Sequence, residues 1–194
     1  PMLHEKTNLP IQQILKEVLE HRKAKGDDKH AYTSFYDDDP ETSNLQILTN
    51  HDEILDTILR YSQSYIDACI IDPDGPNKDL YRLNRRFIQV WYNVYDEGIH
   101  HCWHDHGRSF LSGTIFINLD DQSSPYRIKS PLYPLIKAWS GDGDLRGRWA
   151  QELSFRPDNG DILIWPGWVE HTVPEQKACN NERVTLSFNI SVKR

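Results

Sequence analysis

Three histidines are the residues of this 194-residue chain whose types and spacing best suit chemistry. His104 and His106 are separated by one residue, and His171 lies much further along the chain. Alternate residues of a β-strand project from the same face, so the first two imidazoles could reach one ion. Three protein ligands on one side of a divalent metal leave the other side open, which suits iron(II) and oxygen chemistry. We interpret the histidines as a metal site; ordinary surface or core histidines are the alternative.

Arg183 follows the last of these histidines and is a candidate for binding a carboxylate beside the metal. Its planar guanidinium offers two parallel hydrogen bonds, which the ammonium of lysine does not match. Thr185 should share the strand face of Arg183 and add a hydroxyl group. The alternative is a solvent-facing arginine beside Glu182.

The second half of the chain carries the strands that must position these residues. Its apolar and polar residues alternate, with many aromatic and β-branched side chains, and Gly, Pro and Asn separate the runs. We expect four long strands and two short ones, over 86–95, 110–119, 161–165, 184–192, 126–129 and 151–155.

The first third of the chain is helical in pattern. Apolar residues recur at helical spacing over 9–23 and over 52–69, and Asn50 with Glu53 resembles a capping box before the second helix. Helices followed by many strands predict a mainly-β fold with flanking helices. The expected core is a double-stranded β-helix (jelly roll, cupin-like), with a different sandwich as the alternative.

We expect a single domain over residues 1–194, since this length can bury one core. Within it, 1–80 would form a helical support packed on one face, and 81–194 the jelly-roll core. The segment 131–150 is the expected substrate lid, because its glycines permit movement and its arginines and tryptophans could grip a substrate. A solvent loop without a role is the alternative.

Composition restricts the class of protein. With 29 acidic and 22 basic residues, the net charge of −7 argues against a general nucleic-acid or anionic-membrane surface. No apolar run approaches the roughly 20 residues of a membrane-spanning helix, and the first residues do not read as a signal peptide. The cysteines are widely spaced and form no C-x-x-C pair, so we expect reduced thiols in a cytoplasmic protein: Cys69, Cys102 and Cys179. Cys102 is a conceivable thiolate ligand, with a structural strand residue as the alternative.

Three segments together resemble the 2-oxoglutarate/iron(II) oxygenase family. They carry an H-x-H-x-x-x-x-L-S-G stretch, a G-D-hydrophobic-P-x-W-x-x-H turn and a closing R-x-S/T-hydrophobic-S-F-N strand, in HDHGRSFLSGTIFIN (104–118), GDILIWPGWVEHTV (160–173) and ERVTLSFNI (182–190). The resemblance extends upstream through Trp91-x-Asn93 and Gly98 and, more loosely, over the helical first third. It implies iron(II) bound by His104, His106 and His171, and 2-oxoglutarate bound by Arg183 and Thr185.

The chain departs from the family at the second ligand position. The familiar pattern is His-x-Asp, whereas here His106 occupies the third position and Asp105 the middle one. Strand geometry turns Asp105 away from His104, so we favour His106 as the ligand. A bulge could turn Asp105 inward and restore the two-histidine, one-carboxylate set.

Two neighbouring residues are further candidates for the cosubstrate pocket. Tyr92 and Asn93 should point to opposite faces of one strand, so only one of them can readily line the pocket. Asn93 matches the W-x-N position of the family, whereas Tyr92 has a hydroxyl group that could reach a carboxylate.

The resemblance implies a dioxygenase that consumes 2-oxoglutarate and dioxygen and hydroxylates a C–H bond, releasing succinate and CO2. No catalytic residue beyond the metal ligands is required. A three-histidine, cupin-type dioxygenase without 2-oxoglutarate is one alternative, and a non-catalytic metal-binding jelly-roll module is another. The sequence is compatible with a protein side chain, a nucleobase or a metabolite as substrate, and with any oligomeric state.

Overall fold

Two antiparallel β-sheets form the centre of the computed structural model, which describes residues 2–25, 31–36, 45–69, 82–140, 151–177 and 181–191. The larger sheet has the order β1 (Leu3–Lys6), β8 (Asp161–Pro166), β5 (Leu111–Asn118), β10 (Arg183–Ile190), β3 (Ile88–Tyr95) and β2 (Ala31–Thr33). The smaller sheet has the order β4 (His101–His104), β9 (His171–Val173), β6 (Tyr126–Lys129) and β7 (Glu152–Phe155).

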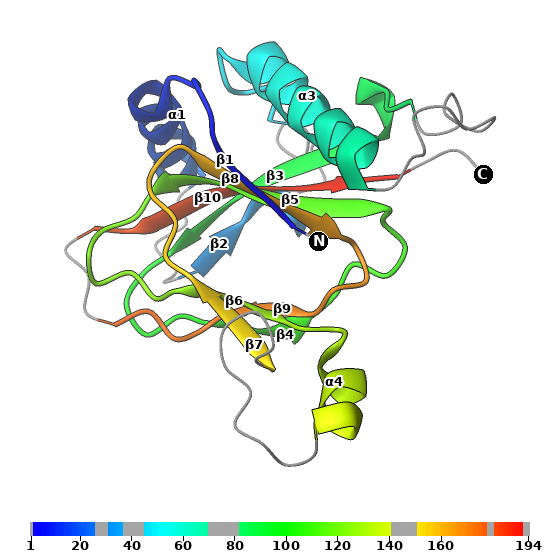
Figure 1. Ribbon diagram of the computed structural model, residues 1–194. Helices are drawn as coiled ribbons and strands as arrows, with labels where there is room; N and C mark the ends of the chain where they lie inside the picture. The colour runs from blue at the N-terminus through cyan, green and yellow to red at the C-terminus, as the bar shows by residue number, and fades with distance from the viewer. Residues whose placement is uncertain are drawn as a thin grey trace.

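Helices cover one side of the larger sheet, and the smaller sheet lies on its other side (Figure 1). The covering helices are α1 (Ile11–Ala24) and α3 (His51–Cys69). A third helix, α4 (Tyr133–Ser140), lies beside the smaller sheet. Two 3-10 turns, η1 (Ser34–Tyr36) and η3 (Arg85–Phe87), flank the strands. This arrangement confirms the predicted mainly-β fold with a double-stranded β-helix core.

The outer face of the larger sheet forms the main hydrophobic core with the helices. On β10 the residues Val184, Leu186, Phe188 and Ile190 are fully buried there. They belong to one cluster with the apolar stripes of α1 and α3, including Ile14, Val18, Ile54, Ile58 and Ile66. Apolar burial of this kind contributes about 25 cal/mol per Å² and is the main force that holds the helices on the sheet.

The inner face of the same sheet is buried and polar. Alternate residues of the three central strands carry amide, hydroxyl and guanidinium groups there: Asn93, Ser112, Thr114, Arg183, Thr185 and Asn189. A second apolar cluster, which includes Phe116, Tyr126, Leu163 and Trp165, closes part of this interior. The polar groups therefore lie between two apolar layers.

Gly113 explains the glycine of the L-S-G stretch. A Cβ at this position would lie 2.2 Å from Phe188 Cζ and 2.6 Å from the Leu163 carbonyl oxygen. The Phe188 ring of β10 and the backbone of β8 leave no room for a side chain here, so the position requires glycine.

The predicted helices and long strands agree with the structure to within about two residues at each end. The side chains of Asn50 and Glu53 are in contact before α3, with Nδ2 and Oε2 3.0 Å apart. The strands β1, β2 and β9 were not predicted, and β1 and β2 bring the first third of the chain into the larger sheet. The strand expected through His104 and His106 is β4, but it ends at His104. The support over 1–80 is therefore not purely helical.

The single domain over 1–194 stays a prediction. Of the expected lid 131–150, the described part contains α4, with Leu132 and Leu135 exposed, and 141–150 lies outside the described residues. Cys69 and Cys102 are exposed free thiols, whereas Cys179 lies outside the described residues.

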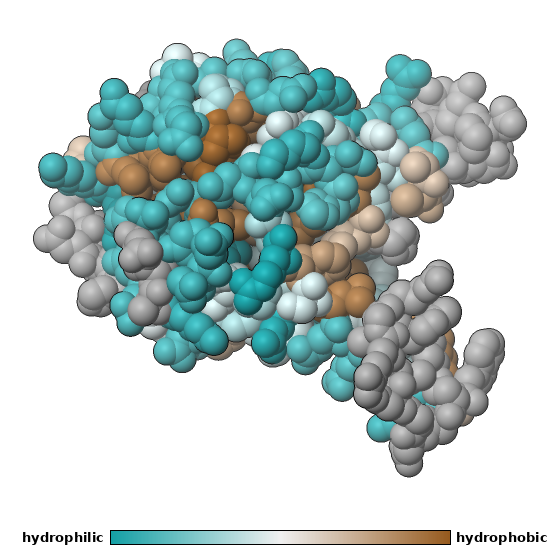
Figure 2. Space-filling model, turned by 60° about the vertical axis from the view of Figure 1, so that its left-hand side comes forward, coloured by the Kyte–Doolittle hydropathy of each residue, from teal (hydrophilic) through white to brown (hydrophobic). Residues whose placement is uncertain are grey.

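The surface of the protein is mainly hydrophilic on the face that Figure 2 shows. Hydrophobic residues form separate patches on this face. Within the described ranges, no helix is both long enough and apolar enough to span a bilayer.

Candidate metal centre and cosubstrate pocket

Three histidines meet at one place, two from the smaller sheet and one from the turn after β4. The antiparallel pairing of β4 with β9 sets His104 directly opposite His171. His106 comes from the turn after β4, where its backbone N–H donates to the Gly167 carbonyl at 2.7 Å. One nitrogen from each ring lies within 4.8 Å of the others. These distances allow one ion to contact all three imidazoles.

The turn that precedes His171 is fixed against the segment that carries His106. The Gly167 N–H donates to the Phe110 carbonyl at 3.2 Å, and a Cβ on Gly167 would lie only 2.2 Å from the Ser109 carbonyl oxygen. The Pro166-Gly167 turn therefore requires glycine because two loops pack backbone to backbone.

The outward ring nitrogens have partners that orient the imidazoles. Nδ1 of His104 lies 2.8 Å from the Cys102 carbonyl, and Nδ1 of His171 lies 3.1 Å from the Val169 carbonyl. A carbonyl only accepts, so each Nδ1 carries the proton and each Nε2 has a lone pair. Metal-binding histidines typically have such outer partners.

Burial keeps two of the three imidazoles neutral. Desolvation, assisted by the neighbouring rings, lowers the pKa of His171 to about 2 and that of His106 to about 4. The neutral form is the one that binds metals, so no proton has to leave these two rings at neutral pH. The donor set therefore fits a divalent ion of the iron or zinc type.

Asp105 does not join this cluster. Its side chain is exposed, and its Oδ1 accepts a hydrogen bond from the Gly107 N–H at 3.0 Å, which stabilises the turn. The structure thus brings together His106, and not Asp105, with the other two histidines. Cys102 also lies outside the cluster.

His101 is a site residue that the sequence analysis missed. Its ring stacks on that of His104 with centroids 3.9 Å apart, and its Nδ1 lies 3.5 Å from the Tyr95 hydroxyl. Burial, with the neighbouring histidines, lowers the pKa of His101 to about 4. Strict alternation would not place it beside His104, but the irregular register of β4 between these residues does.

Arg183 is buried on the inner face at the start of β10, only 1% exposed. Its Nη1 donates to the Ser124 carbonyl at 2.7 Å. The neighbouring Glu182 pairs with Arg22 of α1 at 2.9 Å. The solvent-facing alternative for Arg183 is therefore excluded.

Thr185 and Asn93 also lie on this inner face. Asn93 Nδ2 is 3.5 Å from Thr185 Oγ1 and 3.0 Å from Ser187 Oγ. Asn93 and Ser187 line an interior cavity that the three histidines also line.

The structure corrects the prediction that Tyr92 could line the cosubstrate pocket. Its side chain lies on the helix-covered face, where the hydroxyl is 2.7 Å from His21 Nδ1 and the ring stacks on Tyr32. Because Tyr92 and Asn93 are neighbours on a strand, the inward position of Asn93 requires the outward position of Tyr92. Tyr92 therefore leaves the set of pocket candidates.

Two other tyrosines do line the cavity. Tyr95 pairs with Arg183 in the sheet register, and Tyr126 comes from β6. Burial raises the pKa of Tyr95 to about 12 and raises that of Tyr126 further, although the positive charge of Arg183 acts in the opposite direction on both. Both hydroxyls remain hydrogen-bond donors at neutral pH. Tyr95 lies two residues beyond Asn93, a spacing that could have identified it.

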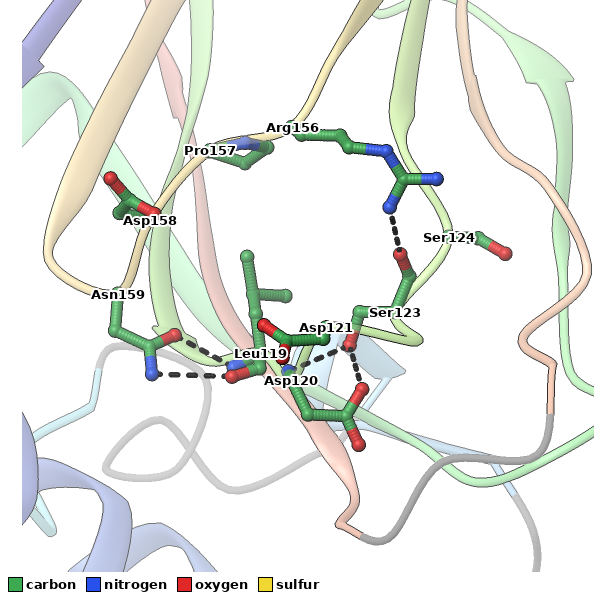
Figure 3. A pocket seen from close by; sticks show the side chains of 9 residues that line it. All are labelled: Leu119, Asp120, Asp121, Ser123, Ser124, Arg156, Pro157, Asp158 and Asn159. Atoms are coloured by element: carbon green, nitrogen blue, oxygen red, sulfur yellow. Dashed lines mark hydrogen bonds between the residues drawn. The ribbon is translucent and has the colours of Figure 1, made fainter.

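The loop that contains Ser123 and Ser124 borders a polar hollow (Figure 3). Asn159 exchanges hydrogen bonds with the backbone of Leu119, at 2.7 and 3.3 Å. Arg156 donates to the Ser123 carbonyl at 3.1 Å. These bonds fix the loop whose Ser124 carbonyl accepts from Arg183.

The cavity shares lining residues, including His104 and His106, with a groove beside β2 that has about 920 Å³ of empty space, part of it open to solvent. Aromatic rings dominate its walls: Phe35 packs on Trp91 with centroids 4.8 Å apart, and Trp91 lies 6.1 Å from His106. Among the described residues that line this groove there is no lysine or arginine, and Asp105 is the acidic one.

The fold and the site together define a double-stranded β-helix with a three-imidazole cluster. The family model described as "Putative 2OG-Fe(II) oxygenase" matches residues 89–189, more than half of the chain. The chain therefore belongs to this family of 2-oxoglutarate/iron(II) oxygenases. Iron(II) and 2-oxoglutarate are accordingly its metal and cosubstrate, as predicted. No curated protein sequence matches the chain.

Solved structures share the fold at low sequence identity. A Pseudomonas putida prolyl-4-hydroxylase is 14% identical, with a TM-score of 0.59 over 100% of this chain and 88% of that chain. A prolyl hydroxylase from Trichoplax adhaerens, in complex with a hypoxia inducible factor oxygen degradation domain peptide fragment, is 8% identical, with a TM-score of 0.62 over 98% and 83%. The epimerase SnoN, in complex with Fe3+, alpha ketoglutarate and nogalamycin RO, is 9% identical, with a TM-score of 0.55 over 98% and 78%.

Proposed function

We propose that the protein is a 2-oxoglutarate-dependent hydroxylase in which His104, His106 and His171 hold the iron(II). The observation that carries the proposal is the meeting of three imidazole nitrogens within 4.8 Å beside a cavity near a buried arginine. Three ligands on one side of the ion leave the other side for the cosubstrate and dioxygen. A fully enclosed structural metal would instead have four protein ligands.

Iron(II) with 2-oxoglutarate and dioxygen supplies the oxidation. One oxygen atom enters the substrate C–H bond as a hydroxyl, the other enters succinate, and CO2 leaves. The residues of the chain bind, orient and exclude water. Trp165 and Tyr126, which pack around His171 with centroids 4.9 and 5.7 Å away, keep one side of the site dry.

Arg183 is the proposed anchor for the distal carboxylate of 2-oxoglutarate. Its charge lies in a buried environment, where charge-assisted hydrogen bonds are strong. Thr185 and Asn93 are proposed to contribute a hydroxyl and an amide. Tyr95 and Tyr126 are close enough to Arg183 for its charge to offset part of the rise that burial causes in their pKa values.

The aromatic groove favours an uncharged, apolar part of a polypeptide as the substrate. A phosphate-bearing substrate would need cationic partners, and the described lining residues include no lysine or arginine. Aromatic grooves are typical binding sites for proline-rich segments. The prolyl hydroxylases that share the fold provide a precedent for this substrate class.

The test is succinate release by anaerobically loaded protein that is then exposed to oxygen, with prolyl peptides and with oligonucleotides. We expect peptide-dependent succinate and a peptide mass gain of one oxygen atom. Arg183→Ala should abolish 2-oxoglutarate binding while iron binding is retained. Arg183→Lys, which keeps the charge but not the planar fork, should bind 2-oxoglutarate with intermediate affinity. Full 2-oxoglutarate binding by Arg183→Ala would remove this residue from the proposal.

A three-histidine dioxygenase that oxidises a chelating substrate without 2-oxoglutarate is the second candidate. The exclusion of Asp105 from the cluster favours it, because such enzymes use imidazole ligands. Oxygen consumption without 2-oxoglutarate, and without succinate, would select this reaction. A non-catalytic metal module would consume no oxygen under either condition.

A further inference from the structure

Ser112 and Asn189 form a buried pair that the proposed reaction leaves without a role. Ser112 is the serine of the L-S-G stretch, and Asn189 is the asparagine of the S-F-N strand. They are register partners across β5 and β10, and Ser112 Oγ donates to Asn189 Oδ1 at 2.7 Å. Both residues are buried, at 1% and 9% exposure, on the inner face of the sheet.

The other end of the Asn189 amide reaches the metal centre. Its Nδ2 lies 3.3 Å from Nδ1 of His106. The corresponding Nδ1 atoms of His104 and His171 face backbone carbonyls, whereas that of His106 faces a side chain. His106 also lies beyond the end of β4, so its ring is not oriented by strand geometry.

The tautomer of His106 depends on which end of the amide faces it. If the amide nitrogen donates to Nδ1, the proton of the neutral ring sits on Nε2 and blocks that atom as a ligand. A 180° rotation of the amide presents Oδ1, which accepts a proton from Nδ1 and frees the Nε2 lone pair. Ser112 permits this rotation, because its hydroxyl can accept from the amide nitrogen as well as donate to the oxygen.

We propose that Asn189, supported by Ser112, is the positioning residue that holds His106 in the Nδ1-protonated form for metal binding. The inference rests on the proposed three-histidine centre. An aspartate ligand in place of His106 would not need a partner that selects its tautomer, since both carboxylate oxygens can bind the metal. A neutral imidazole does need it, and this pair supplies it from the sheet.

The first test is metal affinity, measured anaerobically with iron(II) and with manganese(II) or cobalt(II). Asn189→Leu removes the amide at similar size, and we expect the dissociation constant to rise about 10- to 100-fold. Ser112→Ala should give a smaller rise. Asn189→Asp should rescue binding, because its carboxylate accepts from Nδ1 and cannot donate to it. Asn118→Leu is the matched control: it loses a bond to the Glu182 carbonyl on the same strand pair and should keep wild-type affinity.

The second test reads the tautomer directly in metal-free protein with 15N-labelled histidine. Two-bond 1H–15N correlation spectra should show the His106 proton on Nδ1 in the wild type and in Asn189→Asp. In Asn189→Leu, the proton should shift toward Nε2. An Nε2-protonated His106 in the wild type, or wild-type affinity in Asn189→Leu, would overturn the positioning role. A wild-type protein that binds no metal would instead overturn the proposed function itself.

Discussion

The two faces of strand β10 differ in what they bury. On the outer face, Val184, Leu186, Phe188 and Ile190 pack beneath α1 and α3. On the inner face, Arg183, Thr185, Ser187 and Asn189 point toward the smaller sheet, and three of these four are also buried. Burying a polar group is unfavourable unless it is hydrogen-bonded, so stability alone would favour apolar residues on both faces. The outer face holds the fold together, and the inner face serves the site.

The largest effect should come from removing an imidazole. His171→Ala deletes one of three ligands, and we expect metal binding to be lost while the sheets remain intact. Metal titration and far-ultraviolet circular dichroism measure the two outcomes. Trp168→Ala, an exposed residue of the same turn region, is the control and should bind metal normally. Wild-type affinity in His171→Ala would contradict the assignment of the centre.

The second effect tests the outer face alone. Leu186→Ala leaves a cavity beneath the helices, and we expect the free energy of unfolding to fall by about 2–5 kcal/mol. Urea denaturation measures this loss. The metal affinity of the folded variant should match that of the wild type. A parallel loss of affinity would show that the two faces are coupled through the strand.

Tyr92→Phe tests the correction made to the pocket. The variant loses the hydrogen bond to His21 and should lose about 1 kcal/mol of stability. Its affinity for 2-oxoglutarate should not change, because the hydroxyl lies on the helix side. Isothermal titration calorimetry with 2-oxoglutarate and metal measures this affinity. A lower affinity in Tyr92→Phe would return Tyr92 to the set of pocket residues.

The smallest effect concerns the edge of the larger sheet, where Asp161 contacts His4 at 2.7 Å and Lys6 at 3.2 Å. Burial raises the pKa of Asp161, but hydrogen bonds from His4, the Asp158 backbone and Lys6 outweigh it, and the net pKa is lowered. A lowered pKa in the folded state stabilises the fold above the unfolded value of about 3.9 and loses that contribution as the pH falls. Asp161→Asn should therefore cost up to about 1 kcal/mol at pH 7 and less at pH 3, measured by urea unfolding. An equal cost at both pH values would contradict the ionic contribution.

The sequence predicts the elements that have enough length to show a period. The helices α1 and α3 and the strands β3, β5, β8 and β10 agree with their apolar patterns, because each is long enough to show its pattern over several residues. Strands β2 and β9 have only three residues, too few to show alternation. Strand β1 owes its existence to pairing with β8, a contact between segments that are far apart in the sequence.

The candidate site divides in the same way. The convergence of His104 and His171 agrees with their motif spacing and with the fold it implies. The exclusion of Asp105 agrees with the expectation from alternation, although it arises in the turn after β4. The nearness of His101 depends on the irregular register of β4, which alternation does not describe. Tyr126 enters the cavity because β6 pairs with β9, a neighbour relation that local sequence patterns do not contain.

The backbone bonds between the His106 segment and the Pro166-Gly167 turn have a practical consequence. They join the two ligand-bearing loops through main-chain groups, so the cage exists before any ion arrives. Many small metalloproteins unfold when a chelator strips them. Here, chelation should empty the centre reversibly, and iron supply could switch the enzyme on and off without a cycle of refolding.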